Sequence, residues 1–209
     1  MKIDFVSDVT CPWCAVGLHS LEQALARLDG DVDVELHFQP FELNPDMAAE
    51  GEDALEHLSR KYGASPEQLA QNRQRIRERG AEVGFTFGDR KHVWNTFDAH
   101  RLLQWAGLEG KQRELKHALL SAYHTRAENM GAHDVLLRLA GEVGLDVQRA
   151  RAVLDSGEFG PEVRAREEHY RKLGIHSVPS VIIDDRHLIQ GGQPPEVFER
   201  ALRQIAAGA

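Results

Sequence analysis

The hydrophobic positions near the start of the chain follow first a period of two and then a helical period. Ile3 and Phe5 alternate with polar neighbours, which predicts a strand over about residues 2–7. Apolar residues then recur every three or four positions between residues 15 and 28, as on one buried face of a helix. Asp29-Gly30-Asp31 is expected to end this helix.

A second alternating segment follows directly. Val32, Val34, Leu36 and Phe38 are separated by charged or polar residues, which predicts a second, half-buried strand. A strand, a helix and a strand joined by short links form a βαβ unit. We therefore expect the two strands to be parallel and their crossover to be right-handed.

The middle of the chain shows only helical periodicity. After residue 45 no convincing strand pattern appears for more than a hundred residues. The predicted helical segments cover residues 53–62, 66–83, 95–106, 110–129, 132–143, 146–155 and 159–173. Glycines separate most of them, and His133 or Asp134 is expected to cap the segment after Gly131.

The C-terminal region returns to β character. Residues 180–183 and 187–190 predict a hairpin around an Asp-Asp-Arg turn, and Pro194-Pro195 begins a last amphipathic helix. The order is therefore β-α-β, a helical block, and α-β-β-α. This order predicts an α/β protein, a thioredoxin-like fold with a large all-helical insertion. Residues 1–44 and 158–209 would form the discontinuous thioredoxin-like domain, and residues 45–157 the helical insertion domain.

Cys11 and Cys14 are the only cysteines, and they lie between the first predicted strand and its helix. Pro12 is favoured at the first helical position, which makes Cys11 the N-cap. The N–H groups of Trp13 and Cys14 and the helix dipole should then lower the Cys11 pKa from about 8.5. Cys11 is the predicted nucleophile and Cys14 the more buried resolving thiol. An inward-pointing Asp8 would oppose the thiolate.

Two other interpretations of the cysteine pair remain open at this point. The pair could be half of a zinc site, although the sequence has no second C-x-x-C and no histidine pair at finger-like spacing. Alternatively, both cysteines are inert members of the core. The scattered histidines, without paired carboxylates, do not predict a catalytic metal, so no metal ligands are assigned.

Composition and charge narrow the class of partner. The formal net charge of −8 disfavours nucleic acid and anionic membrane surfaces as partners. No apolar run approaches the length of a membrane span, and Met1 is followed at once by a predicted strand instead of a signal peptide. We therefore expect a cytoplasmic protein. In a reducing cytoplasm a lone cysteine pair is more often catalytic than structural. The oligomeric state stays open.

Val178-Pro179 stands immediately before the third predicted strand. Proline is tolerated at the start of a strand, and the X-Pro bond is the one that adopts the cis form at modest cost. In thioredoxin-like domains a cis-proline faces the C-x-x-C. We therefore predict a cis bond here, with Val178 and Pro179 forming the wall opposite Cys11.

Several segments together resemble the DsbA-like thiol oxidoreductases, in particular their FrnE-like branch. The segments that carry the resemblance are Asp8–Cys14, Pro40–Pro45, Asn95–Leu102, Val178–Ser180 and Gly191–Pro195. The resemblance implies a thioredoxin fold with a helical insertion, disulfide exchange at Cys11, and a helix with Asn95 and His100 over the active-site cleft. It adds Pro12, Trp13, Val178, Pro179, Asn95 and His100 as candidate substrate-binding residues. Asn95 might equally be a plain helix cap, and His100 a structural histidine.

The expected activity is thiol–disulfide exchange through a mixed disulfide at Cys11, with protein thiols or small thiols such as glutathione as partners. The redox-active disulfide replaces a bound cofactor, and glutathione is a possible co-substrate. Relatives of this family include enzymes similar to 2-hydroxychromene-2-carboxylate isomerase and kappa-class glutathione transferases, which usually have serine where Cys11 stands. A glutathione-dependent isomerase or transferase acting on an aromatic molecule is therefore the alternative.

Overall fold

A small mixed sheet forms the centre of the molecule in a computed structural model, which describes residues 1–28, 30 and 32–208. The strands are β1 (Lys2–Ser7), β2 (Glu35–Pro40), β5 (Ser180–Ile183) and β6 (His187–Gln190), in the order β2-β1-β5-β6. β1 and β2 are parallel, as the βαβ pattern predicts, whereas β5 pairs antiparallel with β1 and β6 with β5. The C-terminal hairpin is thus confirmed.

β2 begins later than the alternating residues indicate. Pairing starts with Lys2 opposite Glu35. Val32 and Val34 lie before this first pair and are therefore not part of β2. The preceding helix α1 (Pro12–Arg27) has Leu28 as its C-cap. The predicted stop signal cannot be followed further, because Asp29 and Asp31 lie outside the described residues.

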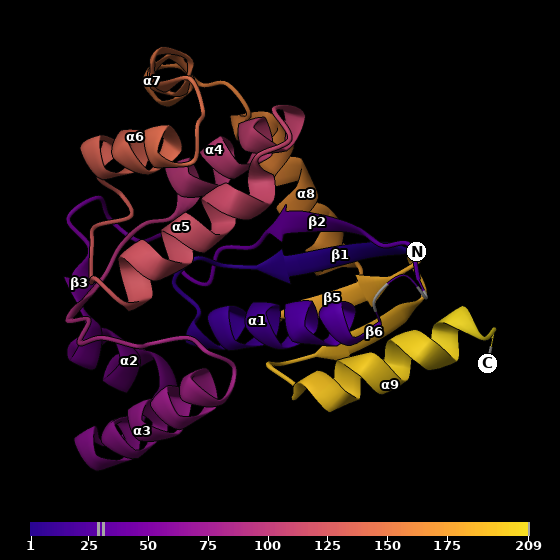
Figure 1. Cartoon of the computed structure of the whole chain (residues 1–209). Helices are drawn as coiled ribbons and strands as arrows, with labels where there is room; N and C mark the ends of the chain where they lie inside the picture. Colours follow the sequence, from indigo (N-terminus) through magenta and orange to yellow (C-terminus); the bar gives the residue numbers. More distant parts are fainter. Residues whose placement is uncertain (29, 31, 209) are drawn as a thin grey trace.

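Helices cover both sides of the sheet (Figure 1). α1 and α9 (Pro195–Ala206) pack together on one side, and α8 (Gly160–Lys172) contacts β2 on the other. The sheet core consists of side chains with no exposed surface from the strands and from α1 and α9, among them Ile3, Phe5, Leu18, Val181 and Phe198. Burial of such side chains is the main favourable contribution to folding.

The helical insertion follows the predicted order with different ends. Its helices are α2 (Ala54–Tyr62), α3 (Pro66–Glu82), α4 (Phe97–Leu108), α5 (Gln112–His124), α6 (His133–Glu142) and α7 (Val147–Asp155). α5 is shorter than predicted because the chain turns after it, with Ala127 in the left-handed region (φ 56°). The predicted cap of α6 is wrong: Ala132 is the N-cap, and His133 instead contacts Asp98.

The insertion also contains a feature that the sequence pattern does not show. Two-residue strands β3 (Glu52–Asp53) and β4 (His92–Val93) pair antiparallel. Two residues are too few to produce a recognisable alternation. Through this pair the segment before α2 is joined to the segment before α4.

The insertion has its own hydrophobic core, yet it also contributes to the sheet core. Buried side chains such as Leu102, Leu119 and Leu136 form the first. Leu120 and Phe85 instead pack with the sheet. The division of the chain at residues 44/45 and 157/158 therefore remains a prediction. In the described part of the chain, no helix is both long and apolar enough to cross a membrane.

Candidate active site

The two cysteines occupy the first turn of α1. Cys11 is the N-cap and Pro12 follows at the first helical position, as predicted. The N–H of Cys14 donates to the carbonyl oxygen of Cys11 at 3.1 Å, which keeps both residues in one turn. Both are free thiols, with Cys11 4% exposed and Cys14 fully buried. Among the described residues no group of three His, Cys, Asp or Glu side chains is placed to hold a metal ion.

Cys11 faces the segment before β5. Its thiol donates to the carbonyl oxygen of Val178 at 3.4 Å, and the Val178–Pro179 bond is cis, as predicted. Among the described residues the Cys11 sulfur accepts no capping hydrogen bond within normal distance, although the N–H groups of Trp13 and Cys14 are near enough to influence its pKa. Pro179 is buried against α1: a Cβ atom added to Gly17 would lie 2.9 Å from its Cγ. The two halves of the site are therefore in direct contact.

The two thiols have opposite tendencies to ionise. The pKa of Cys11 is lowered, first by the Cys14 thiol, against the effect of burial, and then by the N–H groups of Cys14 and Trp13. The Asp8 charge opposes this shift, as anticipated for an inward-pointing carboxylate. Burial and then Cys11 raise the Cys14 pKa well above its usual value. A nucleophilic Cys11 and a protonated Cys14 are what this asymmetry favours.

Asp8 lies beneath the cysteine pair and is only 1% exposed. Its Oδ2 accepts hydrogen bonds from the Leu43 N–H at 2.8 Å and the Thr10 hydroxyl at 2.9 Å. His100 Nε2 lies 3.5 Å from its Oδ1. Burial opposes ionisation, but His100 and the backbone N–H groups more than offset it and lower the Asp8 pKa to about 2. His100, 2% exposed, thus lies against Asp8 and stabilises its charged form.

A cavity of about 770 Å³ opens beside Cys11, with α2 and α3 as its far wall. Of the predicted site residues, Cys11, Pro12, Trp13 and Val178 line it. Cys14, Pro179, Asn95 and His100 are not among the described residues that do. The lining is richer in cations than in acids: its charged residues are Lys61, Arg73, Arg77, Arg90, Arg171, Glu42 and Asp89. This suits a partly apolar, anionic molecule.

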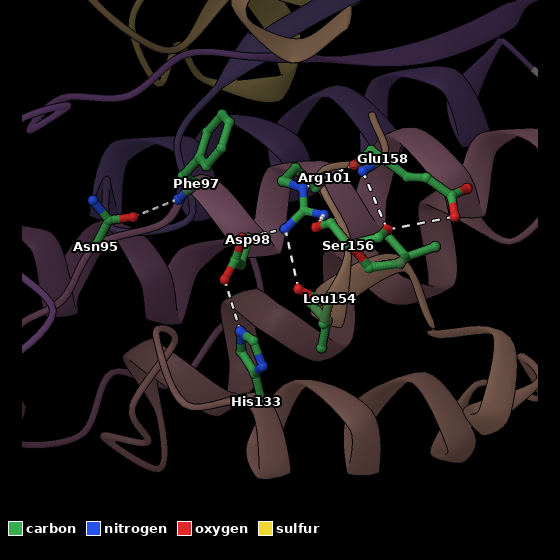
Figure 2. A network of polar contacts seen from close by, with 9 residues as sticks. Asn95, Phe97, Asp98, Arg101, His133, Leu154, Ser156 and Glu158 are labelled. Carbon is green, nitrogen blue, oxygen red and sulfur yellow. Dashed lines mark hydrogen bonds and ion pairs between the residues drawn. The ribbon is translucent and has the colours of Figure 1, made fainter. Parts of the chain in front are cut away.

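Asn95 is a structural residue at the start of α4 (Figure 2). Its Oδ1 accepts a hydrogen bond from the Phe97 N–H at 2.9 Å, and its Nδ2 donates to the Met47 carbonyl oxygen at 3.0 Å. The helix-capping interpretation describes this geometry, although Thr96, and not Asn95, is the N-cap residue itself. Its polar atoms are thus engaged within the protein.

A second buried carboxyl, Glu42, lies at the cavity wall and was not predicted as part of the site. It shares Arg164 with Glu167 of α8, and one carboxyl oxygen of each glutamate has no hydrogen-bond partner among the described residues. Burial and then the Glu167 charge raise the Glu42 pKa to about 8. Glu42 belongs to a segment singled out only as a motif, and nothing in its sequence context indicates burial.

Lys116 on α5 is the other residue that sequence reasoning missed. It is 1% exposed. A signal was present, because Lys116 shares its helical face with Leu119, Leu120 and Tyr123, all of which are buried.

Comparisons with known proteins agree with this architecture. A family model described as a DSBA-like thioredoxin domain matches residues 2–203. The protein YwbO of Bacillus subtilis (strain 168) is 29% identical over 205 residues, covering 97% of this chain and 96% of YwbO. The probable DsbA oxidoreductase SCO1869 from Streptomyces coelicolor is 34% identical, with 100% of this chain and 90% of that chain covered and a TM-score of 0.90.

A more distant structure shares the fold. The cytosolic disulfide reductase DsbM from Pseudomonas aeruginosa, solved with GSH, is 20% identical, with 99% of this chain and 100% of that chain covered. Its TM-score is 0.69. At this level of identity the likeness concerns the arrangement of helices and strands.

Proposed function

Because this chain belongs to the family of DSBA-like thioredoxin domains, whose members are oxidoreductases and isomerases, we propose that it is a thiol–disulfide oxidoreductase using Cys11 and Cys14. The observation that carries the proposal is the placement of two free thiols in the first turn of α1, with Cys11 at the cavity facing Val178 and Cys14 fully buried behind it. The lowered pKa of Cys11 and the raised pKa of Cys14 agree with this division of roles. A thiolate is the nucleophile in disulfide exchange, and the low-pKa thiol is also the better leaving group.

The proposed reaction has two exchange steps. The Cys11 thiolate attacks one sulfur of a substrate disulfide, which forms a mixed disulfide and releases the other substrate sulfur. Cys14 then attacks the Cys11 sulfur, closes the Cys11–Cys14 disulfide and releases the first substrate sulfur. The same steps run in reverse when the oxidised protein meets a dithiol.

We assign substrate contact to the predicted residues that line the cavity, namely Pro12, Trp13 and Val178. Pro179 would hold Val178 in place from its buried position against Gly17. Asn95 and His100 are assigned indirect roles, because Asn95 is hydrogen-bonded within the protein and His100 lies against Asp8. We place the reaction in the cytoplasm, with protein thiols or small thiols as partners.

The test compares Cys11→Ser with Cys14→Ser in insulin reduction and in the refolding of scrambled ribonuclease. Cys11→Ser should lose at least about 100-fold of the exchange rate, because a hydroxyl cannot form the mixed disulfide. Cys14→Ser should still accumulate a mixed disulfide, visible by mass spectrometry. Exchange activity that survives in Cys11→Ser would falsify the proposal.

A second candidate is a glutathione-dependent isomerase or transferase, and the cation-rich cavity beside Cys11 is the observation that favours it. Glutathione carries carboxylates that such a lining would attract. Saturable glutathione binding in calorimetry, without dithiol turnover, would select this function over disulfide exchange. Arg73→Glu should weaken that binding several-fold, whereas Arg151→Glu, the same charge change at an exposed position of α7, should not.

A further inference from the structure

A lysine lies in the apolar interior where α5 meets the sheet. Lys116 is 1% exposed, although lysine is almost never fully buried unless it is paired. No hydrogen bond or ion pair of its Nζ is found among residues 1–28, 30 and 32–208. A burial this costly calls for a compensating role.

The surroundings of Lys116 connect it to the floor of the active site. It borders a small void together with Pro40 at the end of β2 and His100 on α4. Leu120, one turn further along α5, packs in the same hydrophobic cluster as Cys11 and Cys14. Lys116 therefore lies on the face of α5 that packs toward the cysteine pair.

The titratable groups around Lys116 come from several elements. They are Cys11 and Cys14 at the start of α1, Asp8 after β1, His100 on α4 and His124 on α5 itself. Burial lowers the pKa of the Lys116 amine, and the charges of Cys14, Asp8 and Cys11 oppose that shift, in this order. The ammonium charge in turn lowers the pKa of Cys14, against burial and Cys11.

We propose that Lys116 is a positioning residue for the resolving step, in which its buried ammonium group stabilises the thiolate of Cys14. This inference rests on the proposed disulfide exchange at Cys11. Cys14 has to ionise in a place that water does not reach, and a fixed cation nearby replaces the missing solvation.

The step balances with the substrate and the solvent. Cys14 gives its proton to the solvent, and its own thiolate attacks the Cys11 sulfur. The Cys11–Cys14 bond forms while the bond between Cys11 and the substrate sulfur breaks. The two cysteines lose two electrons, the substrate disulfide gains them, and the second substrate sulfur leaves as a thiolate.

The experiment uses the reduced full-length protein and the aromatic disulfide dithionitrobenzoic acid in stopped flow. The first coloured thiolate reports attack by Cys11, and the second reports resolution by Cys14. In Lys116→Met we expect the second phase to slow at least about tenfold at neutral pH and its midpoint to move to higher pH. The first phase should stay within about threefold.

Two further variants separate charge from structure. Lys111→Met, on the exposed N-cap of α5 where Lys111 pairs with Glu114, should leave both phases unchanged. Lys116→Arg should restore part of the second phase. If Lys116→Met fails to fold by circular dichroism, Lys116→Gln takes its place.

The outcomes distinguish the two proposals. A second phase with unchanged rate and unchanged pH midpoint in a folded Lys116 variant would overturn the role of Lys116. The absence of a first phase in the unmodified protein would instead overturn the proposed function at Cys11.

Discussion

Asp8 and Glu42 are buried to almost the same extent, 1% and 2% exposed, yet their regions shift the carboxyl pKa in opposite directions. Around Asp8, backbone N–H groups, a hydroxyl and His100 surround the carboxylate, and its pKa falls to about 2. Around Glu42, one carboxyl oxygen has no hydrogen-bond partner in the described part of the chain and a second acid lies nearby, and the pKa rises to about 8.

The difference shows that burial alone does not set the charge of a group at this site. Donors fixed by the backbone keep Asp8 ionised beneath the cysteines, where its charge opposes the Cys11 thiolate. The carboxyl group of Glu42, by contrast, keeps its proton near neutral pH at the wall of the cavity. The site thus holds a permanent charge below Cys11 and a titratable one at its wall.

Asp8→Asn should have the largest effect. In the variant, the NH2 group of the asparagine would point at the N–H of either Leu43 or Thr10, so one of these N–H groups would lose its acceptor. We expect this to lower the free energy of unfolding at pH 7 by about 2–4 kcal/mol. Because the Asp8 pKa is depressed, this stabilisation is present above the unfolded value of 3.8 and is lost as the pH falls toward about 2. Urea unfolding at several pH values measures it.

Two readouts check the interpretation of Asp8→Asn. The exposed Asp155→Asn should leave the unfolding free energy at pH 7 unchanged. The Cys11 pKa, followed by thiolate absorbance, should fall in Asp8→Asn because an opposing charge is gone. A Cys11 pKa that rises instead would contradict the assigned role of the charge.

Arg164→Met should have an intermediate effect. Arg164 bridges Glu42 and Glu167 and stacks over the Phe97 ring at 3.9 Å, a contact that methionine partly preserves. Removing the cation leaves two buried acids together, so we expect a loss of about 1–3 kcal/mol that grows with pH. Arg151→Met, at an exposed position of α7, is the control, and a loss of stability independent of pH would speak against the shared cation.

Glu42→Gln should have an effect of the opposite sign. A raised carboxyl pKa means that the unfolded chain loses its proton first, so this group lowers stability as the pH rises from 4.5 to about 8. Glutamine does not ionise, and the variant should gain stability over the original protein by pH 8, at most about 4 kcal/mol. Equal stability at pH 5 and a gain at pH 8, measured by urea unfolding, is the expected pattern.

Local periodicity was enough to predict the sheet and the cysteine turn. The βαβ unit, the hairpin after Pro179 and the N-cap position of Cys11 all depend on neighbours in sequence. The contact of Cys11 with Val178 was also predicted, from the proline before the third strand, whereas the predicted capping hydrogen bond to the Cys11 sulfur is not found among the described residues.

Features made by packing between distant segments could not be predicted. The cavity joins residues on both sides of Cys11 to helices α2 and α3, and no single window of sequence contains it. Glu42 lines the cavity and pairs with Arg164 of α8, which is distant in the sequence. Lys116 is the exception, because a lysine among leucines on one helical face already indicates burial.

The central position of β1 has a consequence for how the chain is made. β1 pairs with β2 on one side and with β5 on the other, and roughly 140 residues separate these two partners along the sequence. During synthesis β1 therefore keeps one open, apolar edge for on the order of ten seconds, while the helices of the insertion emerge. An unpaired strand edge invites pairing with other chains, so the growing polypeptide is most exposed to aggregation before Val181 reaches Phe5.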